Sequence, residues 1–218
     1  MATRRDVRPL YEAMVVAVGG PPHSGKTVFL AALYRHILAL RPQNFCYLQR
    51  MCPDGEGVWS SESDPEVVKE IRCKGKFAST FMTTYLPQLQ GLGLMGNFRL
   101  ILADLGGVPP TQSAENAEIL ANCTHQIVLC STLHSDHKAF WLQVAEEEGC
   151  QTIAVFDSRL VKIAGTDELD LSVRSEIELG EVPTGEFRNL DRKQEAVVCY
   201  EDEAQRLAAW LVERVESR

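Results

Sequence analysis

The chain has no apolar run that approaches the roughly 18 residues needed for a membrane-spanning helix. The charged start, Met1 to Arg5, is not followed by the apolar stretch of a secretory signal. We therefore expect no membrane partner and a cytoplasmic location. At 218 residues with 45% apolar side chains, the chain is long enough for one α/β domain with additions.

The cysteines show no pattern typical of disulfide bonds or metal binding. The seven cysteines are odd in number and never form C-x-x-C, which argues against a disulfide framework and against a zinc site. His134 and His137 have the spacing of helical metal ligands, but the sequence offers no second ligand pair, so we interpret them as solvated loop histidines. Cys130 and Cys199 lie in apolar runs, where a thiol behaves as a small hydrophobic group.

Positive charge is in short supply. Lys and Arg number 22 against 30 Asp and Glu, which gives a net charge of −8. Since affinity for nucleic acid depends on neutralising phosphates, long duplex DNA is a disfavoured partner. One local basic strip could bind a small anionic or short nucleotide acceptor: Lys69, Arg72, Lys74 and Lys76. A solvated surface explains these four basic residues equally well.

The most informative feature present is Gly-Pro-Pro-His-Ser-Gly-Lys-Thr at 20–27, which fits the P-loop pattern G-x-x-x-x-G-K-[ST]. The two glycines allow a tight turn whose amides face phosphate oxygens, the lysine adds a charge for the β- and γ-phosphates, and the threonine offers a hydroxyl to Mg²⁺. The following helix directs its positive N-terminal dipole at the anion. The residues predicted to bind a nucleoside triphosphate are Gly20, Pro21, Pro22, His23, Ser24, Gly25, Lys26, Thr27 and Val28, joined by Gly107.

The flanking segments agree with this interpretation. Met14 to Val18 is a continuous apolar run, as expected for a strand buried on both faces. Apolar residues recur at helical spacing between Val28 and Leu40. The alternative is a glycine-rich turn that binds no ligand, but such a turn does not need Lys and Thr after its second glycine.

Strands and helices alternate along the chain, which predicts an α/β fold: a doubly wound, mainly parallel sheet. The predicted strands are 14–18, 45–48, 98–104, 125–130 and 152–156, and the predicted helices are 28–40, 64–72, 77–89 (interrupted at Pro87), 113–121, 138–148 and 201–216, with a glycine-rich connector at 91–96. We divide the chain into a nucleotide-binding core, 1–164, and a β-rich extension with a closing helix, 165–218, packed on the core.

An acid ends the predicted third strand. Asp104 can hold Mg²⁺ through water beside Thr27, because ligands in open α/β sheets bind at the carboxyl edge of the strands. Asp104 to Gly107 also matches the D-x-x-G pattern of switch-bearing NTPases, in which the Gly107 amide faces a γ-phosphate. The alternative for Asp104 is an ordinary turn aspartate.

Other positions bear on which nucleotide base the chain binds and on whether it has a second substrate. A guanine reader would show N-K-x-D where this chain has Phe156 to Arg159, so ATP is favoured over GTP. Asp54 and Glu56 follow the second strand and can accept a proton from an attacking hydroxyl, although Asp54-Gly55 is equally a turn signal. Three arginines could stabilise charge at the site from a lid or from a neighbouring subunit: Arg159, Arg188 and Arg192. The simpler interpretation for each is an ordinary surface arginine. A homo-oligomer therefore stays open.

Across about residues 14–160 the chain resembles P-loop NTPases of the small-kinase type, on the motifs at 20–27 and 104–107. More narrowly, those motifs together with Cys-Pro-Asp-Gly-Glu-Gly-Val-Trp at 52–59 resemble the P-loop domain fused to some CRISPR-associated ring nucleases. The chain departs from these fusions because no nuclease domain precedes its P-loop, so that activity is not carried over. The resemblance implies a nucleotide-handling accessory protein.

These observations favour an Mg²⁺-dependent, ATP-binding phosphotransferase or ATPase, in which Lys26, Asp54, Glu56 and Asp104 carry the catalysis and Thr27 and Asp104 hold the metal. The rival is a nucleotide-gated interaction module, in which NTP binding orders 104–107 and slow hydrolysis resets the switch. A motor of the AAA+ kind is disfavoured because Leu105 stands where such motors carry glutamate.

Overall fold

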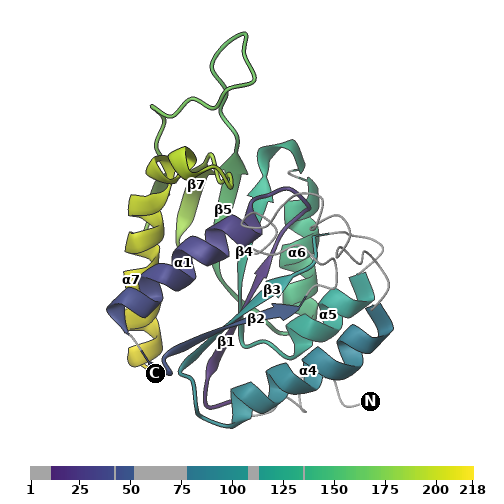
Figure 1. The fold of residues 1–218 in the computed structure, drawn as a ribbon. Coiled ribbons are helices and arrows are strands. Elements are labelled where there is room, and N and C mark those ends of the chain that lie inside the picture. The colour runs from purple at the N-terminus through teal and green to yellow at the C-terminus, as the bar shows by residue number, and fades with distance from the viewer. Residues whose placement is uncertain (1–10, 42, 52–77, 108–112, 135) are drawn as a thin grey trace.

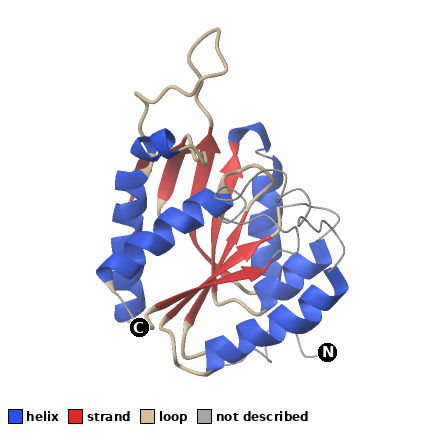
Figure 2. Cartoon of the chain, in the orientation of Figure 1, coloured by secondary structure: helices blue, strands red, loops and turns tan. Residues whose placement is uncertain are grey.

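The sheet is the framework of the molecule. The computed structural model describes residues 11–41, 43–51, 78–107, 113–134 and 136–218. Seven strands form one sheet in the order β2-β3-β1-β4-β5-β7-β6, and every neighbouring pair is parallel except β6 with β7 (Figure 2). This confirms the predicted α/β class. The strands are β1 (Met14–Gly19), β2 (Cys46–Met51), β3 (Leu100–Leu105), β4 (His125–Ser131), β5 (Gln151–Arg159), β6 (Glu176–Glu178) and β7 (Thr184–Arg188).

Helices cover both faces of this sheet (Figure 1). Alternate residues of β1 belong to different apolar clusters: Val16 packs with the helices α1 and α7, whereas Val15 packs with α4, α5 and α6. We call these the α1/α7 face and the α4–α6 face. The helices are α1 (Lys26–Leu40), α4 (Ala78–Leu94), α5 (Ser113–Ala121), α6 (Asp136–Glu147) and α7 (Glu201–Glu216), with short 3₁₀ turns η2 (Thr132–His134) and η3 (Gln194–Cys199).

One predicted helix boundary is wrong. We expected a helix interrupted at Pro87 and a glycine-rich connector at 91–96, but α4 runs through Pro87 and ends at Leu94. Leu86 and Leu89 bury against the α4–α6 face, and this packing offsets the backbone hydrogen bond that the proline cannot donate. Gly93 lies against the Tyr11 ring, where a side chain would clash. The predicted helix 64–72 lies outside the described residues.

The C-terminal segment continues the main sheet. β7 pairs in parallel with β5, and buried residues of β7 and α7 belong to the same apolar cluster as β1 and α1. Between β5 and β6, residues 160–175 form a loop that extends beyond the layers (Figure 1), with a bridge between Lys162 and Leu169. The predicted division of the chain at 164/165 therefore falls inside this loop.

The cysteines of the described residues are buried thiols that form no disulfide bond with one another: Cys46, Cys123, Cys130, Cys150 and Cys199. Burial raises the pKa of the Cys46 thiol to about 12, which keeps it protonated at neutral pH. Among the described helices, none combines the length and apolar character required to cross a bilayer.

Candidate functional site

The loop at 20–27 leaves β1 at the carboxyl edge of the sheet and enters α1. Its two glycines occupy positions that other residues would strain: a Cβ at Gly20 would overlap the carbonyl of Leu129, and Gly25 has a left-handed φ of 82°. A Cβ at Gly25 would also stand 2.6 Å from the Cβ of Leu190. His23 has a φ of 60° and an exposed side chain, so it does not build the loop from within.

Lys26 lies inside this loop. Its Nζ donates hydrogen bonds to the carbonyl oxygens of Gly20 and Pro21, at 2.9 and 2.8 Å, and the residue is only 9% exposed. The Ser24 hydroxyl donates to the Pro21 carbonyl at 2.9 Å. Pro21 and Pro22 have no N–H, so within the predicted binding set they contribute loop shape rather than donors. The remaining amides, from 23 onward, are those that can face an anion.

β3 brings the predicted metal ligand beside this loop. Asp104 pairs with Val18 of β1, two residues before Gly20, and by strand alternation it faces the same side as α1. Asp104 is 9% exposed. A Cβ at Gly107 would lie 2.8 Å from the Lys26 Nζ and 2.7 Å from the Pro22 nitrogen. The structure thus brings both motifs into one site.

The donor set at this site fits Mg²⁺. Thr27 is the second residue of α1, directly after Lys26, so a hydroxyl and a carboxylate, both hard oxygen ligands, come from adjoining elements. Within the described part of the chain, no group of three or more His, Cys, Asp or Glu side chains could hold a metal. Magnesium commonly uses one or two protein oxygens and completes its shell with water and phosphate.

The end of β5 lies beside the phosphate loop. Within the segment Phe156 to Arg159, where a guanine reader would stand, Ser158 reaches the loop: its hydroxyl donates to the Ser24 carbonyl at 2.8 Å. Asp157 points to the α4–α6 face, where Lys138 of α6 pairs with it at 2.5 Å. The carboxylate of Asp157 therefore belongs to the other side of the sheet.

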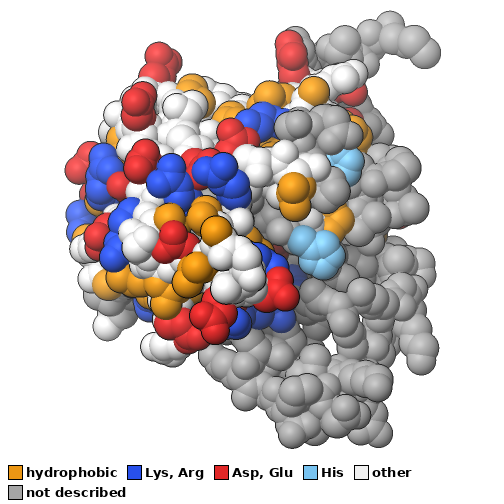
Figure 3. Space-filling model, turned by 90° about the horizontal axis from the view of Figure 1, so that it is seen from above, with side chains coloured by type: hydrophobic (Ala, Val, Ile, Leu, Met, Phe, Trp, Pro, Cys, Tyr) orange, Lys and Arg blue, Asp and Glu red, His pale blue; other side chains and the backbone are white. Residues whose placement is uncertain are grey.

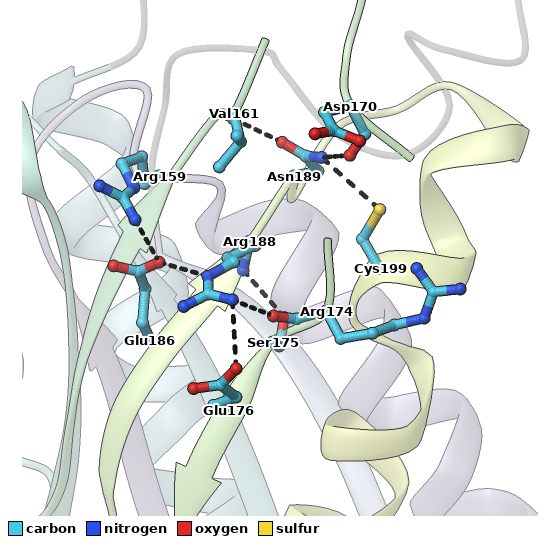
Figure 4. A network of polar contacts seen from close by, with 10 residues as sticks. All are labelled: Arg159, Val161, Asp170, Arg174, Ser175, Glu176, Glu186, Arg188, Asn189 and Cys199. Carbon is cyan, nitrogen blue, oxygen red and sulfur yellow. Dashed lines mark hydrogen bonds and ion pairs between the residues drawn. The ribbon is translucent and has the colours of Figure 1, made fainter. Parts of the chain in front are cut away.

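Arg159 and Arg188, two of the candidate arginines, lie in a network of intramolecular ion pairs (Figure 4). Arg159 and Arg188 both contact the Glu186 carboxylate, at 3.2 and 2.7 Å, and the Glu186 hydrogen bond raises the pKa of Arg188. Arg192 is exposed on the turn after β7. Viewed from above the carboxyl edge of the sheet, basic and acidic side chains alternate over the described surface (Figure 3). This placement favours structural roles for Arg159 and Arg188.

The candidate acceptor residues cannot be placed. Asp54 and Glu56 lie outside the described residues, as does the basic strip at 69–76.

The motifs did not reveal three residues that support the site. Asn116 of α5 is buried and donates to the Gly106 carbonyl at 3.4 Å, inside the D-x-x-G segment. Ser158 and Leu190 contact the phosphate loop from β5 and from the turn after β7. Ser158 and Leu190 lie far along the chain from the loop residues that they contact, whereas Asn116 lies ten residues from Gly106. In each case residue type alone gives no signal for the contact.

No protein-family model matches the chain, and no curated protein matches it in sequence. Among solved structures, a cobyrinic acid a,c-diamide synthase from Mycobacterium smegmatis, determined with a bound ATP analogue and magnesium, matches with a TM-score of 0.57 at 13% identity, covering 94% of this chain and 96% of that chain. A GTPase from Pyrococcus abyssi in its apo form matches with a TM-score of 0.44 at 16% identity, over 67% of this chain and 68% of that chain. A thymidylate kinase from Ehrlichia chaffeensis gives 0.36 at 12% identity, over 71% and 92% of the two chains.

At these identities the comparisons establish the fold, and the synthase carries that argument because its match spans nearly the whole of both chains. Together with the loop at 20–27 between β1 and α1 and the acid at the end of β3, the match places the chain in the class of α/β proteins with the P-loop NTPase fold.

Proposed function

We propose that the chain binds ATP with Mg²⁺ at the loop 20–27 and acts as a phosphotransferase or ATPase. The observation that carries the proposal is the meeting of Lys26 with Gly107: the D-x-x-G glycine lies so close to the lysine that a single Cβ would fill the space between them. Two motifs separated by some eighty residues of sequence therefore meet at the loop that would hold the phosphates.

Each residue has a definite task in this proposal. The amides from His23 to Val28 and the charge of Lys26 hold the β- and γ-phosphates, while the Gly107 amide faces the terminal phosphate. Thr27 and Asp104 would hold Mg²⁺, which neutralises charge on the phosphate oxygens when bound. The Lys26 Nζ bonds to the Gly20 and Pro21 carbonyls keep its charge at the loop before a nucleotide arrives.

The proposal also covers the acceptor of the phosphoryl group. Asp54 or Glu56 would position an acceptor hydroxyl or a water, and the strip at 69–76 would attract a small anionic or short nucleotide acceptor. ATP is favoured over GTP because the segment 156–159, where a guanine reader would stand, does not read N-K-x-D. A CRISPR-associated accessory role and a cytoplasmic location rest on the sequence alone.

A nucleotide-gated interaction module is the second candidate, and one observation favours it. The segment 104–107 contacts the phosphate loop through Gly107 and α5 through the Asn116 bond to Gly106. A γ-phosphate that moved Gly107 would therefore pull on α5, which is the kind of linkage that a switch requires. Slow hydrolysis would reset it.

Titration with ATP and with GTP in the presence of Mg²⁺, followed by phosphate release with and without nucleoside and oligonucleotide acceptors, separates the two candidates. Acceptor-stimulated ATP consumption supports the phosphotransferase, and loss of that stimulation in Asp54→Asn or Glu56→Gln identifies the acceptor residue. Tight binding with negligible turnover under every condition supports the module. Absence of binding to either nucleotide contradicts both.

Lys26→Ala provides the sharpest variant. Removing the loop charge should lower ATP affinity and turnover by about 100-fold or more. Lys138→Ala is the matched control, because it removes another lysine near the carboxyl edge of the sheet but on the α4–α6 face. Turnover retained by Lys26→Ala, or lost equally in Lys138→Ala, would contradict the assignment.

A further inference from the structure

The phosphate loop is held from a part of the chain that no nucleotide-binding motif includes. The Ser158 hydroxyl, on a side chain that is 4% exposed, donates to the Ser24 carbonyl at 2.8 Å across 134 residues of sequence. Leu190, two residues beyond β7, packs against Gly25. Two consecutive loop residues are therefore fixed from β5 and from the turn after β7.

Asn189 links the chain after Ser158 to the turn that carries Leu190, and Figure 4 shows its side-chain bonds to Val161 and Asp170. It is fully buried with a left-handed φ of 53°, and its N–H donates to the Arg159 carbonyl at 2.9 Å. Its Oδ1 accepts from the Val161 N–H at 2.7 Å, and its Nδ2 donates to the Asp170 carbonyl at 2.9 Å. Through its N–H and its Oδ1, Asn189 thereby binds the backbone just after Ser158, and it is itself the residue directly before Leu190.

The bond to Ser24 has a specific geometric effect. The Ser24 carbonyl and the Gly25 N–H belong to the same planar peptide unit and, in a trans peptide, point in opposite directions. Fixing the carbonyl toward Ser158 therefore fixes the Gly25 N–H away from it. In the proposed function that N–H is one of the donors to phosphate, and a preoriented donor binds an anion without reorganisation cost.

We propose that Ser158 is a positioning residue that aims the Gly25 amide of the phosphate loop, and that Asn189 holds Ser158 and Leu190 in place for this task. This inference rests on the proposed function, since it assigns the supports of the same site. It gives the turn after β7, in the C-terminal segment, a part in nucleotide binding.

Ser158→Ala tests the inference with ATP and Mg²⁺ as the probe, measured by calorimetric titration. Loss of one aimed donor should weaken binding about fivefold or more, while Ser158→Thr, which retains the hydroxyl, should stay within about twofold of the wild type. Thr124→Val is the matched control. The Thr124 hydroxyl also bonds to β1 backbone, at the Val15 N–H and C=O, but at the end of the strand opposite the phosphate loop.

The control should lower the melting temperature without changing ATP affinity. Unchanged ATP affinity in Ser158→Ala, or an equal loss in Thr124→Val, would overturn the inference. Asn189→Gly preserves the left-handed backbone and deletes the side-chain bonds to Val161, Asp170 and the Cys199 sulfur, so it should weaken ATP binding as well. Wild-type affinity in that variant would remove Asn189 from the mechanism.

A second readout does not need a nucleotide. Amide hydrogen exchange across 20–27 should quicken in Ser158→Ala and stay unchanged in Thr124→Val. If the wild-type protein binds neither ATP nor GTP, the proposed function fails while this exchange comparison still decides whether Ser158 orders the loop. Equal exchange in the wild type and Ser158→Ala would overturn the positioning role.

Discussion

The two faces of the sheet support the phosphate loop in different ways. On the α4–α6 face, Trp141 of α6 packs beneath the end of β1, and a Cβ at Gly19 would lie 2.6 Å from its ring. On the α1/α7 face, Leu190 packs on Gly25 above an aromatic cluster of Phe29, Phe156 and Phe187. The comparison shows that the α4–α6 face supports the last residue of the strand before the loop, at Gly19, whereas the α1/α7 face supports the residue just before the helix, at Gly25.

The largest expected effect comes from the aromatic cluster. Phe187 is fully buried, with ring centroids 5.1 Å from both Phe29 and Phe156. Phe187→Ala should lower the free energy of unfolding by about 3–5 kcal/mol, measured by urea denaturation, because it removes the contacts and leaves a cavity. Phe140→Ala is the comparison on the α4–α6 face, where a half-buried ring should cost about half as much or less. Equal losses in the two variants would show that the aromatic cluster contributes no more to stability than the half-buried ring on the α4–α6 face.

The features of the site that lie within short stretches of the chain could be predicted from the sequence. The loop at 20–27 and the acid at 104 could be predicted because their chemistry lies within a few consecutive residues and because the alternation of strands and helices places both at one edge. The closing helix 201–216 is also confirmed at both ends, since its apolar stripe and acidic first turn are continuous in sequence.

The contacts that support the phosphate loop from distant parts of the chain could not be predicted from the sequence. The Ser158 bond to Ser24, the packing of Leu190 on Gly25 and the burial of Asn189 depend on strands brought together by long crossovers, and Ser, Leu and Asn are common residues without a chemical signature. Pro87 misled the prediction of α4 for a related reason: tertiary burial of Leu86 and Leu89 outweighed the local preference against proline in a helix.

Two glycines offer a smaller but sharper test of the two supports. Gly25→Ala forces a Cβ into a left-handed backbone and against Leu190, and Gly19→Ala forces one into the Trp141 ring, so each should destabilise the protein by about 1–3 kcal/mol in thermal or urea unfolding. Only Gly25→Ala should also weaken ATP binding, because its backbone carries a phosphate donor. If Gly19→Ala weakened ATP binding as strongly, the conclusion that only the α1/α7 face supports a phosphate donor would be wrong.

The smallest expected effect concerns the pairing of α1 with α7 far from the loop. Arg41, just after α1, contacts the Glu216 carboxylate through its Nε at 2.7 Å and its Nη2 at 2.9 Å, and this hydrogen bonding holds the pKa of Glu216 below its ordinary value. The folded state therefore favours ionised Glu216. Its contribution to stability is complete above the carboxyl's ordinary pKa and disappears as the pH falls through the lowered pKa of the folded state.

Glu216→Gln should accordingly lower the melting temperature slightly at pH 7, and its difference from the wild type should vanish in acid below the folded-state pKa. The effect is small because the pair is exposed to solvent and screened by salt, so 1 M NaCl should reduce it further. ATP affinity should be unchanged, since this pair lies at the end of α1 opposite the phosphate loop. A difference in melting temperature that persisted at low pH would show that Glu216 stabilises the helix pair by packing rather than by charge.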